Sequence, residues 1–167
     1  IYKMAKTRRN QKKRGGTTTP RILGKYEAHI DAIDDKGERP IFTHVKANNF
    51  KMVKILIDKG ANLDYEDDTQ NSLMHYAAKI EDDDIKILEY IIKKSNARDL
   101  ESAVKGINDR NQTPLHLSVV AENAKAAKLL VKNGADIYAV DKEGHTPVSI
   151  AEVADNETML PDMLKNH

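Results

Sequence analysis

One short pattern recurs four times along this chain, and the spacing of its copies constrains the fold more than any other feature. The copies read ERPIFTHV at 38–45, NSLMHYAA at 71–78, QTPLHLSV at 112–119 and HTPVSIAE at 145–152. Five residues before the Thr position of each copy stands an acidic or amide residue: Asp34, Asp67, Asn108 and Asp141. The resulting spacings of 33, 41 and 33 residues indicate a repeat architecture, in which each unit is stabilised by its neighbours.

Two insertions explain the long central spacing. The segment ILEYIIKKS at 87–95 corresponds to MVKILIDKG at 52–60 with a shift of 35 residues, which places two extra residues in the acidic turn IEDDD at 80–84. The remaining six fall between Ser95 and Val104. We expect both insertions, including residues 96–103, to lie in connections, because added loop length costs little closure entropy.

Local signals within each copy predict a turn followed by two short helices. Proline fits the first turn of a helix, where no N–H donor is needed, and a preceding threonine can cap that turn. The prolines are Pro40, Pro114 and Pro147, and the last two directly follow Thr113 and Thr146. Gly60 and Gly134 follow apolar segments with helical spacing and can end the second helices in a left-handed conformation.

The motif and its spacing resemble the ankyrin-repeat family, whose 33-residue unit combines T-P-L-H-x-A with a β-turn and two helices. The resemblance covers about residues 30–164. It implies an all-α repeat fold, an α-solenoid of stacked helix pairs with β-hairpin turns. The implied repeats are 34–66, 67–107, 108–140 and 141–167.

Two turns depart from the family pattern, which has Gly at their fourth position. Asn111 can replace that Gly because Asn tolerates a left-handed backbone. Gln70 tolerates it less well, so we expect a distorted second hairpin.

The net charge of +1 conceals a strong separation. Residues 1–21 contain eight Lys or Arg residues and no acidic residue, whereas the remainder has 19 basic and 26 acidic residues. Because the basic segment has almost no large apolar residues, we expect a disordered arm at 1–21, followed by a truncated N-terminal cap at 22–33. Met4 is a candidate translation start.

The run from Lys6 to Arg14 allows several functions. It suits a nuclear-import signal, a solubilising tail, or a tether to nucleic acid or another anionic surface. Tyr2 is the only aromatic residue in the arm, so any nucleic-acid binding would be sequence-blind and sensitive to salt.

Most catalytic and cofactor classes find no support in the sequence. The absence of Cys excludes disulfides and thiolate chemistry, and no phosphate-binding glycine motif or nucleophile elbow occurs. The longest apolar runs, such as 85–92, are too short to span a bilayer. We expect a non-enzymatic intracellular monomer, cytoplasmic or nuclear, without cofactor; an assembly element that joins chains through incomplete caps is a further alternative.

Two groups of residues could suggest metal binding, and both have simpler structural interpretations. His75 and His116 occupy equivalent motif positions, and repeat geometry separates them too far for one shared metal ion. The resemblance implies that they bond to backbone between repeats. EDDD at 81–84 lacks the pattern of a calcium-binding loop, and Asp83 or Asp84 as a helix N-cap explains it.

The function expected from the resemblance is a protein-interaction module with a concave surface. The residues preceding each turn are Ile33, Glu66, Ile107 and Val140, and three of them are apolar and β-branched. We predict that they contact the partner, although β-branched side chains could instead pack between adjacent hairpins. A charged rim is expected from Asp35, Lys36, Asp68, Arg110 and Lys142 on the turns and from Lys46 and Lys79 on the inner helices.

Overall fold

The computed structural model describes residues 30–35, 37–81, 83–154, 161 and 165. The predicted arm at 1–21, most of the cap at 22–33, Lys36 and much of the predicted last repeat lie outside the described residues. The described part contains helices α2 Pro40–Lys46, α3 Phe50–Asp58, α4 Leu73–Ala78, α5 Lys86–Lys94, α6 Ala97–Lys105, α7 Pro114–Val120, α8 Ala124–Lys132 and α9 Pro147–Val153. None of these helices is long and apolar enough to cross a membrane.

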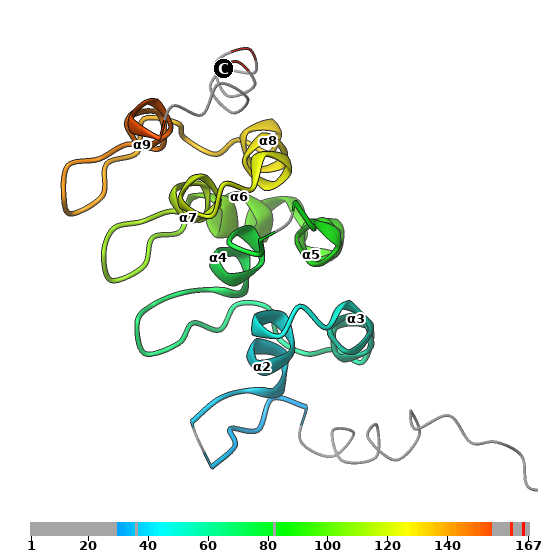
Figure 1. Cartoon of the computed structure of the whole chain (residues 1–167). Coiled ribbons are helices and arrows are strands. Elements are labelled where there is room, and N and C mark those ends of the chain that lie inside the picture. The colour runs from blue at the N-terminus through cyan, green and yellow to red at the C-terminus, as the bar shows by residue number, and fades with distance from the viewer. Residues whose placement is uncertain (1–29, 36, 82, 155–160, 162–164, 166–167) are drawn as a thin grey trace, which may run out of the picture.

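The helices stack in two columns (Figure 1). The inner helices α2, α4, α7 and α9 lie one above another beside the projecting turns, and the outer helices α3, α5 and α8 lie on the far side. Each inner helix contacts the next one, and α2–α3, α4–α5 and α7–α8 pack as pairs. Because such a pair buries its apolar face mainly against its neighbours, stacking follows from the repeat. The predicted all-α repeat fold is confirmed.

Helices begin and end at the residues that the sequence predicts for α7, α3 and α8. The Thr113 side chain accepts the N–H of His116 at the start of α7, and Pro114 occupies the first turn. Gly60 and Gly134 follow the outer helices α3 and α8 with φ values of 92° and 89°. These left-handed conformations reverse the chain at little steric cost because Gly lacks a Cβ atom.

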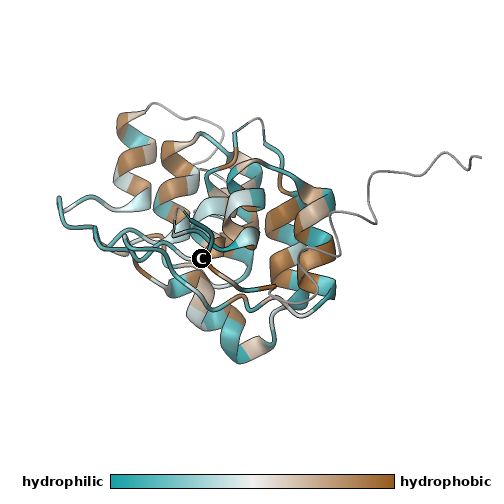
Figure 2. Ribbon diagram, turned by 90° about the horizontal axis from the view of Figure 1, so that it is seen from below, coloured by the Kyte–Doolittle hydropathy of each residue, from teal (hydrophilic) through white to brown (hydrophobic). Residues whose placement is uncertain are grey.

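One continuous apolar core runs through the stack. It extends from Ile41 in α2 to Ala151 in α9, and both side chains are fully buried. The helices carry brown apolar bands, whereas the projecting turns are mostly teal (Figure 2). Apolar spacing close to the helical period therefore gives every helix one face for the core and one for solvent.

The insertion predicted as a plain connection at 96–103 is largely helical and forms most of α6. The side-chain oxygen of Asn96 accepts the N–H groups of Arg98 and Asp99, which caps the helix. Leu100 and Val104, four residues apart, pack against the core, and Val104 is only 1% exposed. The prediction was wrong because it considered the length of the insertion and not its apolar spacing.

The turns close in the same way, including the second one. The N–H of Gln70 donates to the carbonyl of Asp67 at 2.8 Å, and that of Asn111 donates to Asn108 at 2.9 Å. Gln70 and Asn111 have φ values of 59° and 57°. The prediction for Asn111 is confirmed, but the distortion expected at Gln70 does not occur. The Asp67 carboxylate holds that turn by accepting three further hydrogen bonds within it.

Neighbouring turns are linked through their backbones. The N–H of Asp109 donates to the carbonyl of Thr69, and the N–H of Lys142 donates to Arg110, both at 3.0 Å. We call the surface formed by residues 33–35, 37–38, 66–71, 107–112 and 140–145 the turn edge. The links fix the relative positions of the second, third and fourth turns along it.

Candidate interaction surface

The turn edge carries three exposed apolar side chains, which we call the apolar row. Ile33 is 59% exposed, Ile107 is 50% exposed and Val140 is 57% exposed. Glu66, at the equivalent position of the second repeat, is also exposed. Side chains packed between adjacent hairpins would be largely covered, so these values favour a solvent-facing row.

The charged residues predicted to surround this row fall into two groups. Asp35, Asp68, Arg110 and Lys142 are exposed on the turn edge, and Lys36 lies outside the described residues. Lys46 is the last residue of α2, and Lys79 follows α4. These two lysines therefore belong to the inner column, which continues from the turn edge.

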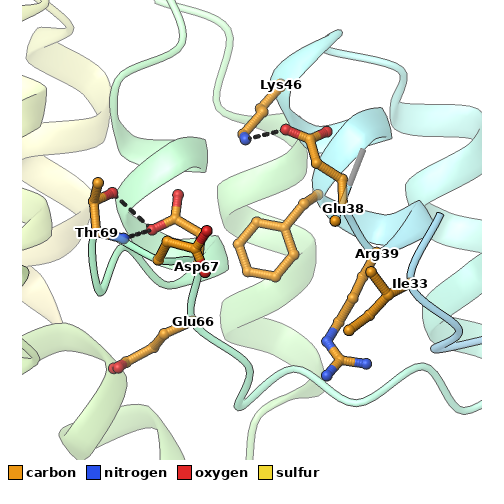
Figure 3. Close-up of a pocket in the computed structure, with 10 residues that line it drawn as sticks. Ile33, Glu38, Arg39, Lys46, Glu66, Asp67 and Thr69 are labelled. Carbon is orange, nitrogen blue, oxygen red and sulfur yellow. Dashed lines mark hydrogen bonds and ion pairs between the residues drawn. The ribbon is translucent and has the colours of Figure 1, made fainter. Parts of the chain in front are cut away.

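A pocket of about 350 Å³ joins these two regions (Figure 3). Ile33 and Arg39 lie on one side, and Glu66 lies on the other. Lys46 and Glu38 border the pocket and form an ion pair, with 2.7 Å between Nζ and Oε1. The pocket thus combines apolar lining with charges of both signs.

Arg39 is held in place by two contacts at the edge of this pocket. Its guanidinium lies 3.5 Å from the centroid of the Tyr65 ring. Its Nη1 also donates to the backbone carbonyl of Asp31 at 2.5 Å. Stacking and hydrogen bonding use the planar shape of the guanidinium, so Arg39 stabilises this wall of the pocket.

Tyr76 on α4 organises the charges deeper in the inner column. Its hydroxyl donates to Asp67 Oδ2 at 2.5 Å, and its ring meets the Phe42 ring edge-on at 5.9 Å between centroids. The Nζ atoms of Lys46 and Lys79 lie 4.6 and 4.4 Å from the centroid of the same ring. One aromatic ring therefore attracts two ammonium groups.

The two lysines differ in their electrostatic surroundings. Burial opposes the charge of Lys46, but its hydrogen bond to Glu38 raises its pKa above the ordinary value. Burial lowers the pKa of Lys79, and the positive charge of Lys46 lowers it further. Within the described part of the chain, no carboxylate forms an ion pair with Lys79.

A second pocket, of about 480 Å³, lies against these lysines. Lys46, Tyr76 and Lys79 line it together with four other residues: Val45, Asn48, Ile80 and Glu81. Lys46 lines both pockets, so a groove continues from the turn edge along the inner column.

Lys46 and Lys79 were predicted from the sequence, but Tyr76, whose ring lies near both ammonium groups, was not. Tyr76 follows the motif His and occupies the position of Leu117 in the third copy. A phenol in place of an aliphatic side chain was the available signal, because a half-buried Tyr usually finds a polar partner.

The two motif histidines link successive repeats. Nδ1 of His75 accepts the N–H of Ser72, and Nε2 lies 2.9 Å from the carbonyl oxygen of Gln112. His116 repeats this pattern with the carbonyl of His145 at 3.3 Å. Because the accepting Nδ1 is unprotonated, Nε2 carries the proton and donates it. The structural interpretation of both histidines is confirmed.

The acidic turn also has structural roles. Asp84 Oδ1 accepts the N–H of Lys86, although the cap position itself is held by Ile85. Asp83 Oδ1 accepts the N–H of Lys125 in α8. Among the described residues, no group of three or more His, Cys, Asp or Glu is arranged to hold a metal ion.

Comparisons with known proteins agree with this architecture. A family model of ankyrin repeats, containing three copies, matches residues 13–103 and 74–166. The p105 subunit of nuclear factor NF-kappa-B from Gallus gallus is 30% identical over 132 residues, which are 78% of this chain and 13% of that protein. A putative ankyrin repeat protein of Fowlpox virus is 30% identical over 120 residues, 66% of this chain and 23% of the relative.

A third relative is an enzyme by name. Phosphocholine transferase AnkX from Legionella pneumophila is 27% identical over 143 residues, 78% of this chain but 14% of that protein. This chain therefore spans less than a quarter of each of these three relatives. Ankyrin repeats are in general protein-interaction modules without enzymatic activity. With a family match along most of its length and the stacked helix pairs, this chain belongs to the ankyrin-repeat family.

Proposed function

We propose that this chain is a non-catalytic module that binds a partner protein through the turn edge and the adjoining groove of the inner column. The exposed apolar row carries this proposal. Ile33, Ile107 and Val140 are each at least half exposed, although polar residues would suffice for solubility at these positions. Aligned apolar groups with a polar surround are typical of protein-interaction surfaces.

The stack supports this role by supplying a rigid surface. Backbone hydrogen bonds link the second turn to the third and the third to the fourth, so side chains on these turns keep a fixed spacing. A partner consequently loses little free energy to ordering of the module when it binds. Charged residues around the row, among them Asp68, Arg110 and Lys142, would select among partners more than they would increase affinity.

Replacing the apolar row tests the proposal. A chain carrying Ile33→Thr, Ile107→Thr and Val140→Thr together should lose the proteins that the wild-type chain retains in quantitative affinity capture. Its free energy of unfolding should change by less than about 1 kcal/mol per site, because these side chains are exposed.

Lys51→Thr is the control, since Lys51 is exposed on the outer helix α3, away from both the turn edge and the inner column. This control should retain the captured proteins. Retained capture by the triple variant, or destabilisation on the scale of a core truncation, would contradict the proposal.

A further inference from the structure

Two lysines, Lys46 and Lys79, place their positive charges beside the ring of Tyr76. Lys46 and Lys79 come from consecutive inner helices, and both Nζ atoms lie within 5 Å of the ring centroid, at 4.6 and 4.4 Å. Their like charges repel one another, and both ammonium groups are partly desolvated although the residues are exposed. An additional negative charge at this position would relieve both effects.

Among the described residues, no carboxylate near the pair forms an ion pair with Lys79. Glu38 bonds to Lys46 and to the hydroxyl of Thr43. Asp67 accepts the Tyr76 hydroxyl, and its other oxygen holds the second turn. Glu81 lines the same groove, but it forms no ion pair with Lys79 in the described structure.

The groove beside Lys79 has room for a ligand side chain. Its volume of about 480 Å³ exceeds that of one amino-acid side chain, and Ile80 adds apolar surface to its wall. The amide of Asn48 supplies a further polar group on the same lining. These features suit an extended segment that presents one carboxylate among uncharged neighbours.

We propose that Lys79, assisted by Lys46, binds an Asp or Glu side chain of an extended segment of the partner protein, beside the Tyr76 ring. This inference rests on the proposed function and specifies the chemistry of the bound segment. Partner segments lacking an acidic residue at this point would leave Lys79 covered but unpaired, which is unfavourable. Lys79 would thus determine which sequences fit the groove.

A library of randomised peptides displayed on phage, selected against the full chain, tests the inference. Enriched peptides should share an Asp or Glu at one fixed position. Lys79→Met should weaken their binding about tenfold, the range expected for one charge pair that the bound segment partly covers. Lys79→Arg should retain most of the affinity, and Lys79→Glu should select peptides with Lys or Arg at that position instead.

The reciprocal change is made in the peptide and does not depend on folding of a variant. Replacing its conserved Asp or Glu by Asn or Gln should weaken binding to the wild-type chain but have little effect on binding to Lys79→Met, as a double-mutant cycle requires. Lys51→Met is the control, because Lys51 is exposed on the outer helix α3.

Three results would overturn the inference: no enriched peptide, enriched peptides without a fixed acidic position, or equal binding by wild type and Lys79→Met. Peptides that depend on the apolar row but not on Lys79 would leave the proposed function standing while rejecting the carboxylate site. The two proposals can therefore fail separately.

Discussion

Nε2 of His75 in the second repeat lies 2.9 Å from the carbonyl oxygen of Gln112, at the start of the third. This bond requires a proton on Nε2, and Nδ1 must stay unprotonated to accept the N–H of Ser72. His116 makes the corresponding link to His145. Successive repeats are therefore joined by imidazoles that must stay neutral.

The first prediction is that stability decreases on mild acidification. Burial lowers the pKa of both His75 and His116 below the ordinary value of 6.5. As the pH falls through that value, the unfolded chain takes up protons that the folded chain resists, so stability decreases until the folded histidines also protonate. The slope should approach about 1.4 kcal/mol per pH unit for each histidine.

Urea unfolding at a series of pH values between neutrality and the carboxylate range measures this slope. The double variant His75→Gln, His116→Gln should lose most of it, with a remainder from His44, whose pKa is also lowered by burial. His145→Gln is the control, because the His145 side chain is 60% exposed. An unchanged slope in the double variant would exclude the two motif histidines as its source.

The second prediction concerns the left-handed turn residue Gln70. A φ of 59° costs a residue with a Cβ atom about 1–2 kcal/mol, part of which Gly would recover despite its larger unfolded-state entropy. Gln70→Gly should therefore raise the free energy of unfolding by about 0.5–1 kcal/mol. Asn111→Gly should produce a smaller gain, because Asn tolerates this conformation. Thermal unfolding of the two variants should rank them in this order, and a loss of stability in Gln70→Gly would reject the argument.

The third prediction tests whether α6 is an integral part of the stack. Asn96→Ala removes the cap of α6 and should cost about 1 kcal/mol, while Val104→Ala should cost about 1–2.5 kcal/mol through loss of buried volume. Limited proteolysis should then cut within 97–105 faster than in the wild-type chain. Ser102→Ala, an exposed change in the same helix, should alter neither property. Rapid cleavage of the wild-type chain in this segment would show that the insertion is a loose connection.

Much of the fold could be predicted because it depends on local residue choice repeated at a fixed spacing. Pro114 and Thr113 mark a helix start in any context, and Asn111 suits a left-handed turn. The insertion was misjudged because its length was considered and the helical spacing of Leu100 and Val104, which pack against the core, was not.

The candidate site was less predictable for a related reason. Lys46 and Tyr76 meet only because repeats stack, and their separation in sequence gives no indication of the contact. The Glu38–Lys46 pair depends on how the first turn is placed above α2. Stacking brings Lys46 and Tyr76 together through tertiary geometry, which spacing within one repeat does not encode.

The most direct test of the central claim is site-specific photo-crosslinking from the turn edge. A photoreactive phenylalanine analogue placed at Ile107 or at Val140 should crosslink the same protein that the wild-type chain captures. Placement at Lys51, which is exposed on the outer helix α3, should not. The proposal predicts crosslinks from both positions. Each crosslink should disappear when Ile33 and the row residue that does not carry the probe are both changed to Thr. Equal crosslinking from Lys51, or none from the row while the wild-type chain still captures its partner, would contradict it.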